Sequence, residues 1–473
     1  MRVQGANMMT LRVHNTMTGQ MEDFQPINGK KVGMYVCGIN TYDDSHMGHA
    51  KSAVTFDVIR RHLVRKGYDV TYVINFTDIE DHCIERTIKL GIPLDQLTEK
   101  YIGEYHKDMG KLGVKKADIY PVASHHMKEI IEAIQKLIEK GFAYESGGEV
   151  YFDVMAVAEF GKLSHRKREE MLAGARIAVD ERKRGPLDFV LWKNKKENEP
   201  FWESPWSEGR PGWHIECSVM SMKYLGESFE LHGGGSELVF PHHENEIMQS
   251  EALSDKPFVK YWLHGGLMNV GSEKMSKSLN NFFTIKDVLK DYDPTVVRFF
   301  LLNTHYRKPI DFNQKALEEA AQALGRIQNT LDNVLAAVGG AAEGDDDFKD
   351  VAREAMTKFD AAMDEDFNTR DAISTIFDFA KEVNKYLESS PKKGTLEAIL
   401  ETFRAYDEIL SIFKFDKGAQ DHMMAPLMDI IIGIRQKARA EKNFKLSDEI
   451  RDRLKELGIV LEDTVEGVKW KII

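Results

Sequence analysis

Two short segments of the chain carry residue types suited to phosphate chemistry. In the first, His46 and His49 flank Met47 and Gly48, just before an apolar pattern that predicts a helix. The free N–H groups and positive dipole end of a helix start attract anions, and Gly48 lets a nucleotide approach the backbone. Both imidazoles would then contact phosphates. Taken alone, so short a pattern is more simply a helix start that contains two histidines.

The second segment runs from Lys274 to Ser278 and reads KMSKS, in a polar loop that follows a glycine. Its two ammonium groups suit the negative charge that builds on transferring phosphoryl oxygens. A solvated basic loop would contain the same residues. The combination with the upstream histidines is specific, however, and it predicts four catalytic residues: His46, His49, Lys274 and Lys277.

A third set of residues has the chemistry of a metal site. His242 and Glu246 are four positions apart, so on a helix they point the same way. Cys37 and Cys217 each follow a strand-like segment, and these segments could converge on that helix. Zinc takes such sulfur, nitrogen and oxygen ligands. From the residues alone, buried free thiols and a solvated His/Glu pair are commoner. Cys83 is expected to be a packing residue.

A parallel sheet is needed to position these groups. Residues 31–37 and 70–74 are β-rich runs, and the apolar residues between them recur at helical spacing until Gly67. The resulting βαβ unit binds ligands at the carboxyl ends of its strands, where His46 to His49 lie. A strand over 229–232 that runs into three glycines predicts a second strand-to-helix turn.

The rest of the chain divides by pattern. Residues from about 100 to 215 are less regular and are predicted to be an insertion within a Rossmann-type catalytic domain spanning 10–313. Helical periodicity predicts a helical bundle over 314–419. Residues 420–473 are predicted to form a small mixed α/β module ending in a hairpin. The fold class is therefore α/β, with a bundle and a terminal module appended.

Longer motifs link these residues to a known family. They are Tyr35-Val36-Cys37-Gly38, Gly212-Trp213-His214-Ile215-Glu216-Cys217, and the run from His232 to Glu237 followed by Phe240 to Glu246. Together with HxGH and KMSKS, they make nearly the whole chain resemble the cysteinyl-tRNA synthetases, which are class I aminoacyl-tRNA synthetases. The resemblance implies activation of L-cysteine with ATP and Mg²⁺, and its transfer to the 3′ end of tRNA(Cys).

The resemblance also implies roles for individual residues. One zinc ion per chain, which selects the substrate thiol, would be held by Cys37, Cys217, His242 and Glu246. ATP would be bound by His46, Gly48, His49, Glu237 and Lys277. The cysteine pocket would be formed by Gly38, Asn40, Thr41, Trp213 and His232. A core tryptophan and a core histidine are the alternatives for the last two.

Two positions depart from the family pattern. Asn40 stands where the family usually has threonine, and Thr41 follows it, which affects hydrogen bonding to the substrate. Glu237 stands where aspartate is common, and its longer side chain is still expected to reach a ribose hydroxyl.

The C-terminal region has a local basic excess. Between Arg435 and Lys455 there are eight Lys or Arg residues against four Asp or Glu. RNA phosphate is a plausible counterpart, although a solvated helix face would show the same count. Trp470 offers an aromatic surface for an unstacked base. The family resemblance implies that this module meets the anticodon, with Arg435 and Trp470 as expected tRNA contacts.

Composition limits the alternatives. The chain has 473 residues, 42% hydrophobic and 30% charged, which excludes a disordered protein. No apolar run approaches the ~20 residues that span a bilayer, and the first residues lack the apolar stretch of a signal peptide, so a cytoplasmic protein without membrane contact is expected. The net charge of −12 does not exclude a basic face. Three scattered cysteines argue against a disulfide framework. The oligomeric state is not determined by the sequence, and a monomer is favoured.

Two other functions remain open at this point. One is a related ligase that joins cysteine to an amino sugar, which residues 420–473 disfavour because such relatives are shorter at the C-terminus. The other is a non-catalytic RNA-binding paralogue. The intact histidine and lysine motifs argue against it, since a binding module needs no phosphate-transfer lysines.

Overall fold

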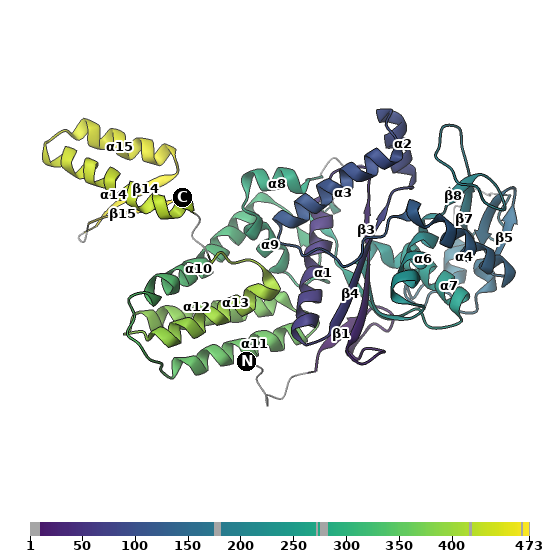
Figure 1. Cartoon of the computed structure of the whole chain (residues 1–473), viewed down its shortest axis with the longest axis horizontal. Helices are drawn as coiled ribbons and strands as arrows, with labels where there is room; N and C mark the ends of the chain where they lie inside the picture. Colours follow the sequence, from purple (N-terminus) through teal and green to yellow (C-terminus); the bar gives the residue numbers. More distant parts are fainter. Residues whose placement is uncertain are drawn as a thin grey trace. The chain divides into compact units, whose positions relative to one another are not determined.

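The computed structural model describes residues 10–174, 181–270, 273–274, 282–415, 419–464 and 467–472. The chain forms two compact units. The first ends at Phe413 and the second comprises Lys414–Ile473 (Figure 1). No helix in the described part of the chain is long and apolar enough to cross a membrane.

A four-stranded parallel sheet forms the centre of the first unit. Its strands are β3 (Lys31–Asn40), β4 (Asp69–Thr77), β9 (Phe229–Gly235) and β10 (Val259–Gly265), in the order β10-β9-β3-β4. Helix α1 (Met47–Arg65) connects β3 to β4 and packs on the sheet. The predicted βαβ unit is therefore confirmed. The β-branched and aromatic residues of the four strands suit a sheet whose strands are largely buried, as in other parallel sheets.

Strand β9 is longer than its apolar residues predict. It continues through Gly233 to Gly235, so the expected turn begins only afterwards. The reason is the packing of α1. A Cβ on Gly233 would lie 2.2 Å from the Phe56 ring, so only glycine lets this helix approach the strand so closely.

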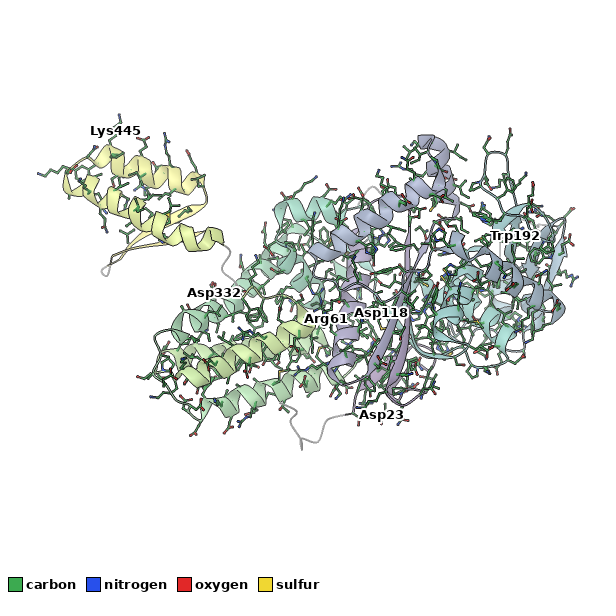
Figure 2. All side chains as sticks on the ribbon, viewed as in Figure 1. Asp23, Arg61, Asp118, Trp192, Asp332 and Lys445 are labelled. Carbon is green, nitrogen blue, oxygen red and sulfur yellow. The ribbon has the colours of Figure 1, made fainter. Side chains whose placement is uncertain are left out.

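An antiparallel sheet is inserted between β4 and β9 in the sequence. It consists of β5 (Ala143–Ser146), β6 (Glu149–Phe152), β7 (Phe189–Asn194) and β8 (Gly209–Pro211). Its core includes the fully buried Trp192, which is labelled in Figure 2. Helices α4 (Met127–Glu139), α6 (Trp213–Leu225) and α7 (Glu244–Ser254) contribute to the same core.

The segments just before this sheet still belong to the parallel layer. Helices α2 (Asp81–Leu90) and α3 (Leu94–Lys111) precede it, and Tyr105 of α3 packs edge-on against Phe76 of β4. Ile119 and Val122 then bridge to β4 in parallel register. The region predicted as an insertion from about residue 100 thus begins with segments that extend the parallel sheet. The short helix α5 (Arg168–Gly174) lies within the insertion.

Four long helices follow the sheet. They are α10 (Gln314–Val338), α11 (Phe348–Asp364), α12 (Thr369–Leu387) and α13 (Lys393–Leu410). Helices α8 (Ile285–Asp291) and α9 (Pro294–Leu302) lead into them. Short strands complete the unit: β1 (Arg12–Asn15), β2 (Gln20–Asp23), β11 (Met268–Val270), β12 (Glu273–Lys274) and β13 (Ile310–Asp311). The helical region predicted from residue 314 is present.

The second unit has its own small core. Helices α14 (Ala419–Ala440) and α15 (Phe444–Glu456) pack against the hairpin of β14 (Ile459–Thr464) and β15 (Gly467–Ile472). Buried residues from these elements form the core: Met428, Ile432, Leu454 and Ile459. The half-buried Trp470 packs against this core, opposite Leu461 in the hairpin. The predicted terminal hairpin is confirmed.

Buried charges connect α1 to the long helices. The Asp57 carboxylate accepts hydrogen bonds from Arg61 (2.8 Å) and from Arg298 of α9 (2.5 Å). Arg298 also donates to the carbonyl oxygens of Leu112 (3.0 Å) and Leu410 (2.5 Å), at the ends of α3 and α13. All three charged side chains are almost fully buried. Arg61 is labelled in Figure 2. Arg298 thus donates to helix-terminal carbonyl groups that would otherwise lack hydrogen-bond donors.

We expect Asp57→Asn to lower the free energy of unfolding of the first unit by about 3–5 kcal/mol, since it leaves two buried guanidinium groups without their counter-charge. Urea titration followed by circular dichroism measures this loss. Asp360→Asn is the control, because Asp360 pairs with Arg65 (3.0 Å) at a partly exposed site and should cost at most about 1 kcal/mol. Equal losses in the two variants would show that the buried network is not a special stabilising element.

Candidate active site

A cavity of about 430 Å³ opens at the carboxyl ends of β3, β9 and β10. Of the predicted site residues whose side chains the structure describes, eight line it: Cys37, Gly38, Asn40, His46, Gly48, His49, Trp213 and Glu237. Motifs separated by almost 200 positions in the sequence therefore meet around one space. This arrangement agrees with the rule that open α/β sheets bind ligands beyond the carboxyl ends of their strands.

The two histidines of the HxGH motif cap the N-terminus of α1. His46 is the N-cap residue, and its Nδ1 accepts a hydrogen bond from the His49 backbone N–H (3.2 Å). The two rings stack, with their centres 3.6 Å apart. A Cβ on Gly48 would lie 2.8 Å from the His46 ring, so glycine is required for this ring position. The motif thus holds both imidazoles at the positive end of a helix dipole.

Residues that follow the KMSKS segment are fixed to the same helix start. The Met47 N–H donates to the Phe283 carbonyl (3.1 Å), and the Ile285 N–H donates to the Ser45 carbonyl (3.0 Å). Lys286 of α8 pairs with Asp44 (2.7 Å), just before His46. The backbone of Lys274 lies in β12. The predicted phosphate-contacting Lys277 lies outside the described residues.

Four predicted metal ligands converge beside the cavity. The donor atoms of Cys37, Cys217, His242 and Glu246 all lie within 4.8 Å of one another. Cys37 comes from β3, Cys217 from the first turns of α6, and the other two from the residues at the start of α7. The placement of Cys217 after a strand was wrong, because its apolar neighbours face the core from a helix. Two thiols, an imidazole and a carboxylate match the donor preferences of Zn²⁺.

Their mutual electrostatics are those of a compact ligand set. A hydrogen bond from the Cys37 thiol lowers the pKa of Cys217 to about 6, whereas burial raises the pKa of Cys37 well above its usual value. Burial opposes ionisation of Glu246, but His232 and His242 lower its pKa to about 2. For His242, burial is outweighed by Glu246 and Cys217, which raise its pKa to about 10. A divalent cation would take the place of the protons shared by these groups.

A chain of histidines supports this cluster. His232 Nε2 lies 2.9 Å from one oxygen of Glu246, and His242 Nε2 lies 3.0 Å from the other. His243 Nδ1 is 2.7 Å from His264 Nε2, which leaves His243 Nε2 3.4 Å from the Cys37 sulfur. Cys37, His232, His243 and Glu246 form a second possible donor set. The sequence reasoning missed His243 and His264, although the adjacent pair His242-His243 signalled the first of them.

Trp213 is a cavity residue. Its side chain is 39% exposed, and its ring centre lies 4.4 Å from that of His242. It therefore does not have the burial of a core tryptophan, and it forms an apolar wall directly beside one metal donor. His214 Nδ1 lies 2.8 Å from His242 Nδ1, and burial lowers the pKa of His214 well below its usual value. This neutral imidazole orients the ring of His242.

Comparison with known proteins gives the family. A family described as the tRNA synthetases class I (C) catalytic domain matches residues 23–322, and the DALR domain matches residues 358–414. The cysteine--tRNA ligase of Geobacter sulfurreducens is 48% identical over 98% of this chain and 100% of its own length. That of Thermococcus onnurineus is 47% identical with the same coverage.

The chain belongs to the cysteine--tRNA ligase family of class I synthetases.

Solved structures support the fold alone. The Mycobacterium tuberculosis methionyl-tRNA synthetase bound by methionyl-adenylate superposes with a TM-score of 0.61 at 13% identity, covering 81% of this chain and 92% of that one. A leucyl-tRNA synthetase from Agrobacterium radiobacter gives a TM-score of 0.61 at 12% identity, covering 82% and 85%. The predicted α/β class I fold is confirmed. Neither an amino-sugar ligase nor a non-catalytic paralogue is supported by the relatives.

Within this family assignment, two residues predicted for the cysteine pocket do not line the cavity. Thr41 is fully buried, and its hydroxyl lies 3.4 Å from that of Thr98 on α3, so its side chain packs between elements. His232 is also fully buried and contacts Glu246. The structure thus places the Thr41 and His232 side chains away from the cavity wall, contrary to their predicted place in the pocket. Cys83 is buried and hydrogen-bonds the Thr77 carbonyl (3.6 Å), as a packing residue should.

The C-terminal predictions need one correction. Arg435 is 4% exposed, so its side chain belongs to the interior of the small unit and does not offer a surface contact for phosphate. Exposed basic side chains lie farther along, near the end of α14 and on α15, and include Lys445, which is labelled in Figure 2, and Lys455. Trp470 is half-buried and packs on the core of the unit.

We expect the purified protein to contain one zinc ion, and Cys217→Ser to release it, because serine is a poor zinc ligand at neutral pH. Elemental analysis of parent and variants measures this. His243→Asn distinguishes the two donor sets: it should retain zinc if Cys217 and His242 are ligands. Cys83→Ser is the matched control and should also retain it. Loss of zinc from His243→Asn together with retention in Cys217→Ser would assign the ion to the second set.

Proposed function

We propose that the protein is a cysteine--tRNA ligase that activates L-cysteine with ATP to cysteinyl-adenylate, with release of pyrophosphate, and transfers the cysteinyl group to the 3′ end of tRNA(Cys), with release of AMP. One observation carries the proposal: Cys37 belongs to the metal-donor cluster and also lines the cavity that contains the HxGH motif. A sulfur-preferring centre and a phosphate-binding helix start therefore face the same space.

In this proposal, adenylate formation is mainly a matter of positioning and charge. The carboxylate of cysteine attacks the α-phosphorus of ATP, and pyrophosphate leaves. The imidazoles of His46 and His49, held at the positive end of the α1 dipole, bind phosphate oxygens. Lys277, supported by Lys274, neutralises the charge that develops in the transition state. Glu237, which lines the same cavity, accepts a hydrogen bond from a ribose hydroxyl. Mg²⁺ accompanies ATP as part of the co-substrate.

The metal centre accounts for the choice of amino acid. Zinc held by Cys37, Cys217, His242 and Glu246 would supply a soft Lewis acid that prefers a substrate thiolate to the hydroxyl of serine. His232 and His214 hold Glu246 and His242 in place through contacts of 2.9 Å and 2.8 Å. Trp213 excludes water from the apolar side of the pocket.

Cysteine-dependent exchange between ATP and pyrophosphate tests the first half-reaction, and charging of tRNA(Cys) tests the second. Activity in both supports the proposal. Exchange without charging would favour the amino-sugar ligase. Binding of RNA with neither activity would favour the non-catalytic paralogue. The C-terminal unit is proposed to bind the anticodon region, and both a monomeric state and a cytoplasmic location stay predictions.

We expect Lys277→Ala to lower the rate of cysteine-dependent exchange by about 10²-fold or more and to change the KM for cysteine little, because its charge acts on phosphate oxygens in the transition state. Steady-state exchange kinetics measure both parameters. Lys290→Ala removes an exposed lysine of α8 and serves as the control. An unchanged rate in Lys277→Ala would remove this residue from the mechanism.

We also expect the double variant Lys445→Glu and Lys455→Glu to raise the KM for tRNA several-fold and to reduce the salt dependence of charging, since each exposed lysine is proposed to contact RNA phosphate. Cysteine activation should be unchanged. The control is Lys128→Glu with Lys358→Glu, which makes the same charge change on α4 and α11 of the first unit. Equal tRNA kinetics in both double variants would contradict a role of this surface in tRNA binding.

A further inference from the structure

Lys51 of α1 is a buried cation that the proposed chemistry does not use. It lies one turn into the helix, two residues after His49, and is 4% exposed. It nevertheless lines the same cavity as the HxGH motif. A buried ammonium group loses hydration and needs acceptors, so its partners indicate what it does.

Its two hydrogen-bond acceptors are backbone carbonyls from different segments. Lys51 Nζ donates to the carbonyl oxygen of Gly266, just after β10, and to that of Lys308 (2.9 Å), just before β13. These two segments also bond to each other: the Gly266 N–H donates to the Tyr306 carbonyl (2.9 Å), and the Ile310 N–H donates to the Leu267 carbonyl (3.0 Å). One side chain of α1 therefore fastens both segments to the helix.

The fastened segment forms part of the cavity wall. Gly265, Gly266, Leu267 and Met268 all line the cavity. The backbone packing at this point is tight, because a Cβ on Gly266 would lie 2.4 Å from the carbonyl carbon of Lys308. With no side chain of its own, Gly266 is positioned by backbone bonds and by the Lys51 ammonium. Loss of that donor would leave two carbonyl groups without a partner and release the wall from α1.

The charge of Lys51 interacts with that of another cavity residue. Burial lowers the pKa of Lys51 to about 8, and the charge of Glu237, which also lines the cavity, opposes this shift. Glu237 is the residue proposed above to hold the ribose. The interaction with Glu237 therefore associates Lys51 with the nucleoside of ATP, whereas the imidazoles of the HxGH motif are proposed to bind its phosphates.

We propose that Lys51 is a positioning residue for the nucleoside of ATP, which acts by holding the Gly265–Met268 wall against α1. This inference rests on the proposed use of the cavity for ATP. It separates the roles of two parts of one helix: its N-terminus binds phosphate, and its second turn sets the shape of the pocket for adenosine.

Replacement of Lys51 by methionine keeps the length and apolar stem of the side chain and removes the donor. We expect Lys51→Met to weaken adenosine inhibition of the exchange reaction, and to raise the KM for ATP, by about tenfold or more, the loss expected for a charge-assisted hydrogen bond. The KM values for pyrophosphate and cysteine should change less than about twofold. Lys51→Arg, which retains a donor, should recover most of the adenosine affinity. Lys128→Met, at an exposed site of α4, is the control.

The outcomes distinguish the possible roles of Lys51. Unchanged adenosine inhibition in Lys51→Met overturns the proposal, as does weaker binding of pyrophosphate with intact adenosine binding, which would make Lys51 a direct phosphate contact. A uniform loss of all parameters that Lys51→Arg does not recover would also overturn it, because that result indicates a purely structural role.

Calorimetric titration of the full chain with adenosine measures the pocket without turnover. A parent protein that binds adenosine but shows no exchange refutes the proposed reaction, while the comparison of Lys51 variants remains valid. A parent protein that binds no adenosine overturns both the use of the cavity and the role of Lys51.

Discussion

The close approach of β3 to β4 at Gly38 is the constraint on which the site depends. The Gly38 N–H donates to the Asn75 side chain (3.0 Å), and a Cβ at this position would lie 1.7 Å from the Asn75 carbonyl oxygen. The strand register shifts here, between Val36 and Ile39. At this irregularity lies the half-buried Cys37, which belongs to the metal-donor cluster and also lines the cavity. The proposed metal centre and the ATP cavity thus adjoin each other at the point where β3 departs from regular strand geometry, at Gly38.

Glu246 organises the charges behind this strand. Its two oxygens contact different histidines, His232 and His242, so its orientation is fixed before any ligand arrives. Glu244, two residues earlier in the same motif, binds a different part of the molecule. Glu244 is fully buried and accepts hydrogen bonds from three backbone N–H groups, those of Gly161, Leu163 and Ser164. The first turn of α7 therefore contacts the metal-donor cluster through Glu246 and a loop of the insertion through Glu244.

Much of this arrangement could be predicted from sequence, for identifiable reasons. The HxGH motif and the pairing of His242 with Glu246 depend on local helical spacing, which the sequence contains. Thr41 and Arg435 were misplaced because the direction of a side chain depends on which neighbouring element covers it. His264 and Lys51 were missed for a related reason. A single buried histidine or lysine looks like a solvated one until distant segments, such as that around Gly266, are seen to enclose it.

Helix α1 joins the site to the long helices as one rigid element. Its first turn carries His46 and His49, while His62 and Lys66 at its other end both contact Asp364 of α11 at 2.9 and 2.8 Å. The boundary near residue 313 is thus a change of secondary structure and does not separate independent modules. A shortened enzyme for engineering or crystallisation would have to retain the chain through Phe413, the end of the first compact unit, for the HxGH histidines to keep their support.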